Sequence, residues 1–212
     1  CSDDWAPGVT DASTQVEPLE EYKLKTATEH TEFDSTQTHL AVIIPAISRS
    51  DPDYYNLLVA NYIFGGSGFG SWLMEEIRQK RGLSYSVYSY LSTYQNSGYL
   101  RISLQTKNES INLAKNIIRE QVDKLSRFDV EDAKIAATKN AILRSFEMRA
   151  DTNRKILNLI SSINYLNLDL NYFENYKNNL KQVNKDSIKA ALNRAMDFDN
   201  ISVFTVGKSI EQ

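Results

Sequence analysis

Cysteine and histidine are almost absent from this chain of 212 residues, and each shortage excludes a kind of site. The single cysteine, Cys1, can form no disulfide within the chain and cannot build a multi-thiolate metal site. The two histidines, His30 and His39, occur in neither a His-x-x-Glu-His nor a His-Glu-x-x-His arrangement, so the usual hydrolytic zinc motifs are missing. A ligand set of these histidines with Glu29 or Glu32 stays conceivable if their two strands pair. The simpler interpretation places both histidines at the surface or on an edge strand, so we predict no metal in this chain.

Long apolar runs and a strong charge of one sign are also lacking. No stretch of about 18 apolar residues occurs, so the sequence predicts no membrane span. Lys and Arg number 24 and Asp and Glu 27, which leaves a net charge of −3. Nucleic-acid-binding domains usually carry a clear basic excess, so we expect no nucleic-acid partner.

What is present indicates an ordinary globular chain with a sizeable core, since 42% of the residues are hydrophobic and 24% are charged. Residues 1–16 are polar and contain Pro7 and Gly8, which predicts a linker or a flexible arm. No boundary is evident further on, so residues 17–212 are predicted to form a single domain.

Hydrophobic periodicity and turn residues predict a mixture of strands and helices. Strands are expected over 22–28, 40–44 and 201–206, with a hairpin of 85–94 and 99–106 around the turn Asn96-Ser97-Gly98. Helices are expected from Asp51-Pro52 to Gly65-Gly66, over about 71–80, 151–166 and 170–181, and after caps at Asn108, Asp129 and Asn184. Because no regular βαβ alternation appears, we predict an α+β fold: a mostly antiparallel sheet with helices packed on one face.

Four glycines, Gly65, Gly66, Gly68 and Gly70, gather between two predicted helices. A phosphate-binding loop would need a Lys after the glycines, and the dinucleotide pattern would need a glycine where Ser71 stands. Two interpretations stay open: a tight turn that needs glycine for its backbone conformation, or such a turn that also forms an exposed lip beside a substrate groove.

The region from Asn61 to Val87, with the segment just before it, holds the most distinctive residues of the chain: Asp51-Pro52-Asp53-Tyr54-Tyr55, Asn61, Gly65-Gly66, Gly70-Ser71, Leu73, Glu76-Ile77-Arg78 and Arg81-Gly82-Leu83-Ser84-Tyr85-Ser86-Val87. In these residues the chain resembles the non-catalytic, zinc-free domain of the pitrilysin-like zinc peptidases. These inverted zincins include insulin-degrading enzyme and mitochondrial processing peptidase. The resemblance extends more weakly over about residues 37–207. Trp72 departs from the basic residue common at its position.

This resemblance implies both a fold and a role. Family members pair two similar domains around a chamber: one binds zinc through His-x-x-Glu-His, and the other supplies an Arg and a Tyr seven residues apart. Arg78 and Tyr85 stand at that spacing here. The chain would then have a processing-peptidase-like fold and be the substrate-binding half of a zinc metalloendopeptidase, inactive alone. Its partners would be the zinc-bearing domain and a peptide substrate, and the family suggests an extracytoplasmic, periplasmic bacterial location.

The implied roles agree with the chemistry of amide hydrolysis. A phenol or guanidinium aimed at the developing oxyanion stabilises the transition state more than the ground state. The catalytic candidates are therefore Arg78 and Tyr85, with Arg81 as a second substrate contact, and the candidate substrate-binding glycines are Gly65, Gly66, Gly68 and Gly70. Without the resemblance, a helix arginine is usually a solvated charge, and a tyrosine in a tyrosine-rich strand is usually a packed ring.

Two other functions stay open. The chain can be a structural or binding module that keeps this fold without protease function, or an independent hydrolase with an unrecognised site. A face that normally meets the catalytic half is also expected to favour a homodimer when the domain is isolated.

Overall fold

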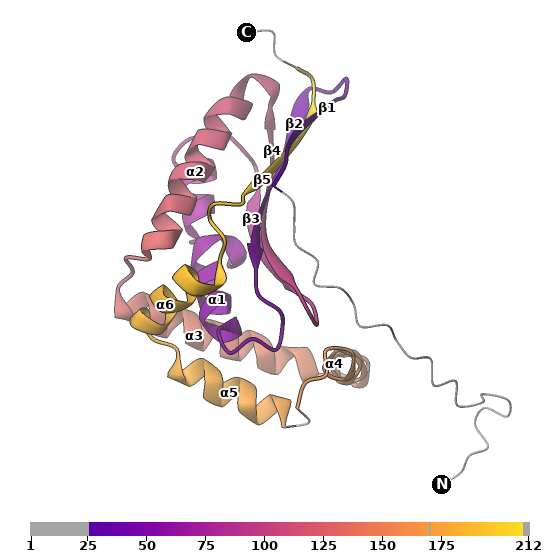
Figure 1. Ribbon diagram of the computed structural model, residues 1–212, viewed down its shortest axis with the longest axis vertical. Coiled ribbons are helices and arrows are strands. Elements are labelled where there is room, and N and C mark those ends of the chain that lie inside the picture. Colours follow the sequence, from indigo (N-terminus) through magenta and orange to yellow (C-terminus); the bar gives the residue numbers. More distant parts are fainter. Residues whose placement is uncertain (1–25, 170, 210–212) are drawn as a thin grey trace, which may run out of the picture.

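A five-stranded sheet with helices on one side makes up the fold (Figure 1). The computed structural model describes residues 26–169 and 171–209, apart from the side chains of Glu147 and Arg149. The strand order is β1-β5-β2-β4-β3; β1 runs parallel to β5, and every other pair is antiparallel. The strands are β1 (Thr28–Glu32), β2 (Gln37–Ala46), β3 (Val87–Thr93), β4 (Gly98–Lys107) and β5 (Ser202–Gly207). The predicted α+β class is confirmed, while the predicted arm 1–16 lies outside the described residues.

Alternation of side chains explains the central strands. Leu40, Val42 and Ile44 of β2 are buried, whereas Ala41 and Ile43 between them point to the other face. Strand β4 follows the same pattern and pairs with β2 along its whole length. Period-two alternation therefore gives the sheet one apolar face that must be covered.

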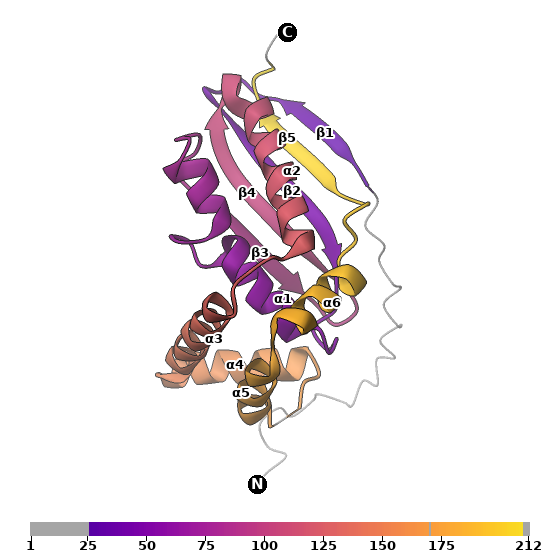
Figure 2. The same cartoon turned by 90° about the vertical axis from the view of Figure 1, so that its left-hand side faces the viewer.

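Helices cover that face (Figure 2). The α-helices are α1 (Tyr54–Asn61), α2 (Ile111–Arg127), α3 (Asp132–Glu147), α4 (Asn153–Tyr165), α5 (Tyr172–Gln182) and α6 (Lys185–Ala195). Figures 1 and 2 show α2 along the sheet and α3, α4 and α5 gathered at one end of the molecule. None of the described helices is long and apolar enough to cross a membrane.

The helix start predicted at Asp51 and Pro52 is wrong by two residues. Helix α1 begins at Tyr54. The Asp51 carboxylate instead accepts the Asp53 backbone N–H at 2.8 Å and forms an ion pair with Arg194 at 2.8 Å. The Asp51 carboxylate therefore pairs with a cation distant in the sequence and does not cap α1.

The predicted cap at Asn184 is confirmed, and the one at Asp129 is wrong. Asn184 and Ser187 form a reciprocal capping box at the start of α6. Helix α3, in contrast, begins only at Asp132, while Asp129 pairs with Lys185 at 2.9 Å.

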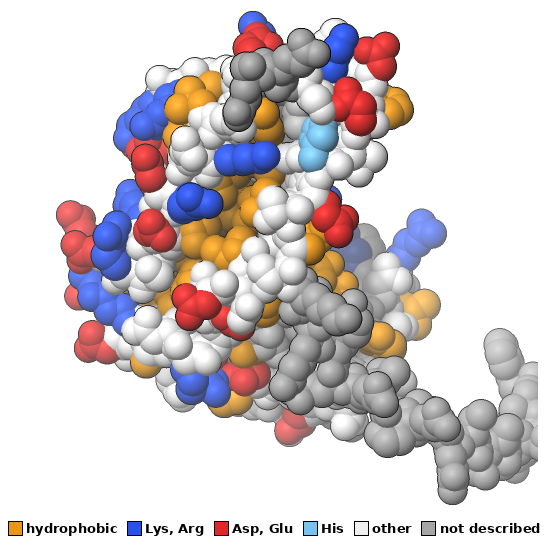
Figure 3. Space-filling model, turned by 45° about the horizontal axis from the view of Figure 1, so that its top comes forward, with side chains coloured by type: hydrophobic (Ala, Val, Ile, Leu, Met, Phe, Trp, Pro, Cys, Tyr) orange, Lys and Arg blue, Asp and Glu red, His pale blue; other side chains and the backbone are white. Residues whose placement is uncertain are grey.

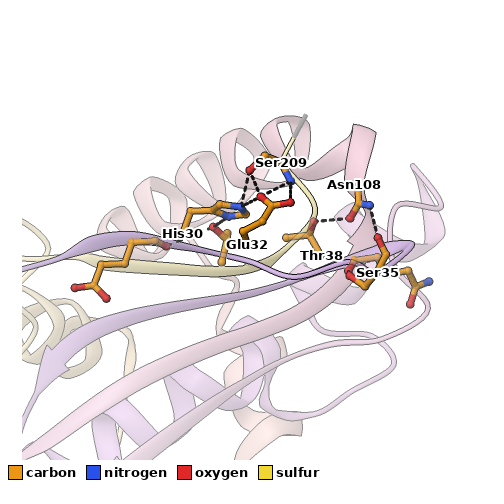
Figure 4. A network of polar contacts seen from close by, with 9 residues as sticks. His30, Glu32, Ser35, Thr38, Asn108 and Ser209 are labelled. Carbon is orange, nitrogen blue, oxygen red and sulfur yellow. Dashed lines mark hydrogen bonds and ion pairs between the residues drawn. The ribbon is translucent and has the colours of Figure 1, made fainter. Parts of the chain in front are cut away.

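Asn108 precedes the predicted helix but does not cap it with its side chain. Figure 4 shows that its side chain instead joins the turn between β1 and β2. The Thr38 hydroxyl donates to Asn108 Oδ1 at 2.8 Å, and Asn108 Nδ2 donates to the Ser35 carbonyl at 2.7 Å. Since Thr38 is only 1% exposed, Asn108 satisfies a buried hydroxyl.

Asn108→Ala is therefore expected to lower the free energy of unfolding by about 1–3 kcal/mol, because it leaves a buried hydroxyl without its acceptor. Urea unfolding measures this change. The matched control is Asn112→Ala in α2, an exposed position where stability should be unchanged or slightly raised. Equal stabilities of the two variants would contradict the assigned role of Asn108.

Candidate functional site

Two wide helical turns flank the glycine cluster. Helix α1 runs directly into a π-helical turn over Tyr62–Gly66, and a second π-helical turn spans Met74–Gln79. Such turns are rare and occur frequently at functional sites. The observed helices agree with the two predicted around the glycines.

The glycines have different surroundings. Gly65 is buried, and a Cβ there would lie 2.5 Å from Ser89 Oγ, so this position packs the turn against β3. Gly68 and Gly70 have φ angles of 69° and 87°, which L-residues with side chains rarely adopt. Between them the side chain of Phe69 is presented outward and is 68% exposed.

Arg78 and Tyr85 meet at the surface. Arg78 lies in the second wide turn, and Gly82, with φ of 61°, ends this turn and sends the chain toward β3. The Arg78 guanidinium carbon lies 4.6 Å from the centroid of the Tyr85 ring. Tyr85 is 83% exposed, so its ring is not packed in the interior.

Phe69 is a member of this cluster that the sequence analysis missed. The Arg78 guanidinium carbon lies 4.6 Å from the Phe69 centroid, the same distance as from Tyr85. The sequence signal for Phe69 was an aromatic residue between two glycines of a predicted turn, a place where a large apolar side chain is expected to be exposed. We call Phe69, Arg78 and Tyr85 the Arg78 cluster.

Arg81 belongs to a neighbouring ion-pair network. Its Nη1 donates to the Glu76 backbone carbonyl at 3.0 Å and to the Glu76 carboxylate. Lys80, four residues after Glu76, pairs with the same carboxylate at 2.6 Å. Hydrogen bonds from Lys80 and then Arg81 hold the pKa of Glu76 below its ordinary value of 4.5. Arg81 is thus held toward Glu76, and its contact with substrate stays a prediction.

A groove on the uncovered face of the sheet begins beside Tyr85. It measures about 490 Å³, and its lining includes Ser86, which follows Tyr85 directly, together with Tyr88, Tyr90, Arg101 and Phe204. Apart from Ser86, which precedes β3, these side chains come from β3, β4 and β5, and the groove also includes His39 of β2. Aromatic rings can pack against apolar side chains of an extended peptide, and an arginine can donate to its carbonyl oxygens.

A different hollow lies between α2 and the sheet (Figure 3). Its apolar lining includes Val42, Ile118 and Val203, and Lys115 and Arg119 stand beside it. Figure 3 shows hydrophobic side chains in the hollow with basic ones across it. It contains no arrangement of groups for acid–base or nucleophilic chemistry.

The two histidines do not converge on a metal. Strand β5 lies between β1, which carries His30, and β2, which carries His39. His30 pairs with Thr205, which faces the helices, whereas His39 lines the groove on the opposite face. In the part of the chain that the structure describes, no group of three or more His, Cys, Asp or Glu is placed to hold a metal ion.

His30 contacts Ser209 and Glu32 without forming a nucleophilic triad (Figure 4). Its Nε2 lies 3.1 Å from Ser209 Oγ and 3.5 Å from the Glu32 carboxylate, while Nδ1 contacts the Thr205 hydroxyl at 2.9 Å. In a triad the acid holds the ring nitrogen opposite the nucleophile. Here the acid lies on the same side as the serine, so the contacts attach the end of the chain to β1.

Comparison with known proteins agrees with this architecture. The family model for the Peptidase M16 inactive domain matches residues 4–142. The chain belongs to this family. Among solved structures, the peptidase M16 inactive domain from Pseudomonas fluorescens superposes with a TM-score of 0.81 and 29% identity, covering 89% of this chain and 44% of that one.

Two curated bacterial relatives carry different descriptions. Over 142 residues this M16 inactive domain is 38% identical to the non-peptidase homologue YmxG of Helicobacter pylori, covering 62% of this chain and 31% of that protein. Over 124 residues it is 30% identical to the uncharacterised zinc protease YmxG of Bacillus subtilis, covering 58% of this chain and 30% of that protein. The matched part of this chain therefore covers less than a third of the length of each relative.

Glu76→Gln tests the network that holds Arg81. Loss of the carboxylate should lower the free energy of unfolding at pH 7 by about 1 kcal/mol or less, as for other surface ion pairs. Because the folded-state pKa of Glu76 is lowered, this contribution is present above its ordinary pKa of 4.5 and is lost as the pH falls through the folded-state value. Urea unfolding should show a smaller difference in free energy of unfolding between variant and parent at about pH 3 than at pH 7.

The control for this experiment is Glu75→Gln, which removes an ion pair with Lys80 only. Its effect should be smaller, since the Glu75 carboxylate pairs with Lys80 at 2.9 Å, whereas Arg81 pairs with Glu76. A difference for Glu76→Gln that grows on acidification would contradict the pKa direction.

Proposed function

We propose that this M16 inactive domain is the substrate-binding half of a zinc metalloendopeptidase, in which the Arg78 cluster contacts the scissile peptide at the zinc of a partner domain. The partner carries the His-x-x-Glu-His motif and the zinc, and this chain supplies no metal ligand. The domain is inactive alone because it has neither the metal nor the water that the metal activates.

One observation carries the proposal: the guanidinium of the half-buried Arg78 lies over the exposed ring of Tyr85. The Arg78 guanidinium lies 4.6 Å from the Tyr85 ring, and that ring is 83% exposed. Tyr85 is therefore not part of the hydrophobic core. Two aromatic rings and a cation at the surface bury little area and so add little to the stability of the fold. A binding role explains their position better.

The chemistry follows from where charge develops. Attack on an amide carbonyl places negative charge on its oxygen, and a preorganised donor near that oxygen lowers the barrier. A tyrosine hydroxyl supplies one donor, and a guanidinium supplies a planar fork that fits backbone carbonyls. In this proposal Tyr85 faces the oxyanion and Arg78 orients the peptide.

The remainder of the peptide would lie along the groove on the open sheet face. Ser86 connects the Arg78 cluster to this groove, and Tyr88, Tyr90 and Arg101 continue it. Gly68 and Gly70 flank Phe69 in the sequence, and Gly66 and Gly70 are exposed, so this turn would form a border of the cluster beside the peptide. Gly65, being buried, supports this turn through packing.

A second function is favoured by one relative. The 38% identical protein of Helicobacter pylori is called a non-peptidase homologue, so a binding or structural module of the same fold is the alternative. The two functions differ in the partner: only a catalytic half with His-x-x-Glu-His can turn over peptide. Mixing this domain with that half and zinc, before and after chelation, distinguishes them. Activity of this chain alone after chelation would exclude both.

Arg78→Ala and Tyr85→Phe should each reduce kcat of the zinc-loaded complex by about 10²–10³-fold, the usual cost of removing one oxyanion donor. The fold should be unaffected, since both changes remove exposed or partly exposed groups. Steady-state hydrolysis of a fluorogenic peptide library, together with thermal unfolding, measures both properties.

Matched controls are Arg154→Ala and Tyr165→Phe, which remove the same groups from the exposed surface of α4. Their turnover should equal that of the parent. Full turnover in both Arg78→Ala and Tyr85→Phe would remove the role assigned to the pair, even if the complex with the zinc-bearing half forms.

Phe69→Ala tests whether the second ring positions Arg78. A cation–π contact is worth about 0.5–2 kcal/mol, so kcat/KM should fall roughly 2- to 30-fold. Phe69→Tyr should restore activity because it keeps the ring, and Phe33→Ala, at a position that is 62% exposed on the β1–β2 turn, should have no effect. If kcat/KM falls in Phe69→Ala and stays equally low in Phe69→Tyr, the ring does not position Arg78.

A further inference from the structure

A pocket of about 510 Å³ is lined by residues of the loop after β2, of α1 and of α5. Figure 1 shows α5 at one end of the molecule, beside α3 and α4. The loop that follows β2 forms one wall, and α5 forms another. Its lining includes Arg49, Tyr55, Tyr172, Asn175 and Asn179. None of its lining residues belongs to the Arg78 cluster or to the groove on the open sheet face.

Arg49 is a buried cation at this pocket. It is 6% exposed, its guanidinium carbon lies 3.5 Å from the centroid of the Tyr54 ring, and its Nη2 donates to the Tyr172 hydroxyl at 2.9 Å. Within residues 26–169 and 171–209, no carboxylate forms an ion pair with it. A guanidinium has five N–H donors, and burying one without a carboxylate is costly.

The acidic residues at the rim are engaged elsewhere. Asp51 pairs with Arg194 at 2.8 Å, and Asp169 Oδ1 accepts the Asn171 backbone N–H at 2.7 Å. Neither carboxylate pairs with Arg49, whose side-chain hydrogen bond goes to the Tyr172 hydroxyl, yet their negative charge disfavours an anion of high charge in the same pocket. A ligand with a single carboxylate suits this charge distribution better than phosphate.

Amide side chains form the wall opposite the loop. Asn175, Asn179 and Gln182 lie at i, i+4 and i+7 on α5 and therefore on one face of the helix, and all three line the pocket. Their side-chain amides make no hydrogen bond with another described residue. Each offers both a donor and an acceptor, the pairing that a peptide group requires.

We propose that this pocket binds a monocarboxylate joined to an amide, the chemistry of a peptide's C-terminal residue. The carboxylate accepts from the Arg49 fork, which Tyr54 and Tyr172 hold in place, and the adjoining peptide group pairs with the amides of α5. The site acts as an anchor for a peptide end and is independent of the proposed peptidase role, because it shares no residue with the Arg78 cluster.

The test is a binding titration of this chain, followed by NMR, with four probes. N-acetyl-alanyl-alanine should bind saturably, and its C-terminal amide at least tenfold more weakly, because the amide offers no charged acceptor to Arg49. Acetate, which lacks the peptide group, and inorganic phosphate should also bind more weakly than the free acid. Equal binding of acid and amide overturns the proposal, as does the absence of binding by the acid. If acetate binds as tightly as the dipeptide acid, the proposed contact with the peptide group is wrong. If phosphate binds more tightly than the dipeptide acid, the preference for a monocarboxylate is wrong.

Two variants locate the binding without removing the buried cation. Asn179→Leu should reduce affinity for the free acid at least tenfold, because it replaces a polar wall group by a bulky apolar one. Asn178→Leu, the same change at the neighbouring exposed position of α5 outside the pocket lining, should leave affinity unchanged. Arg49→Lys keeps the charge but not the fork and should also weaken binding. Equal affinities of the Asn178 and Asn179 variants overturn the location, and the proposed peptidase function is untouched by that result.

Discussion

The contact of the Arg78 guanidinium with the rings of Phe69 and Tyr85 is the interaction on which the candidate site depends. A free arginine at a surface samples many rotamers, and ordering it costs conformational entropy. Two rings at 4.6 Å restrict that motion by contacts that leave the guanidinium edge available for oxygen acceptors. The backbone conformations at Gly68, Gly70 and Gly82 serve this contact, because they bring a turn, a helix end and a strand start to one place.

The elements that sequence patterns predicted well are those whose signal is local. Strand β2 follows from a short apolar run rich in β-branched residues, and the β3–β4 hairpin from its turn residues. The cap at Asn184 depends on a residue three positions away. The pair of Arg78 and Tyr85 came from a family resemblance, and the structure adds their contact. Phe69 was not predicted, because a single aromatic residue among glycines is not part of a periodic hydrophobic pattern.

The predictions that were wrong depended on side chains that have distant partners. Asp51 is used by Arg194, 143 residues away, and Asn108 by Thr38, 70 residues away. A local rule treats such polar side chains as helix caps, whereas the fold supplies a stronger or more deeply buried partner. The same applies to the metal alternative at the histidines: β5, from the far end of the chain, separates their strands.

Inhibition by a phosphinic peptide is the most direct test of the claim that the Arg78 cluster acts at the partner's zinc. Such a compound imitates the tetrahedral species, so its Ki reports binding of the transition state, while KM of the matching peptide reports largely ground-state binding. In the zinc-loaded complex, Tyr85→Phe should raise Ki by about 10²–10³-fold and change KM little. Equal changes in Ki and KM, or no change in either, would contradict the account.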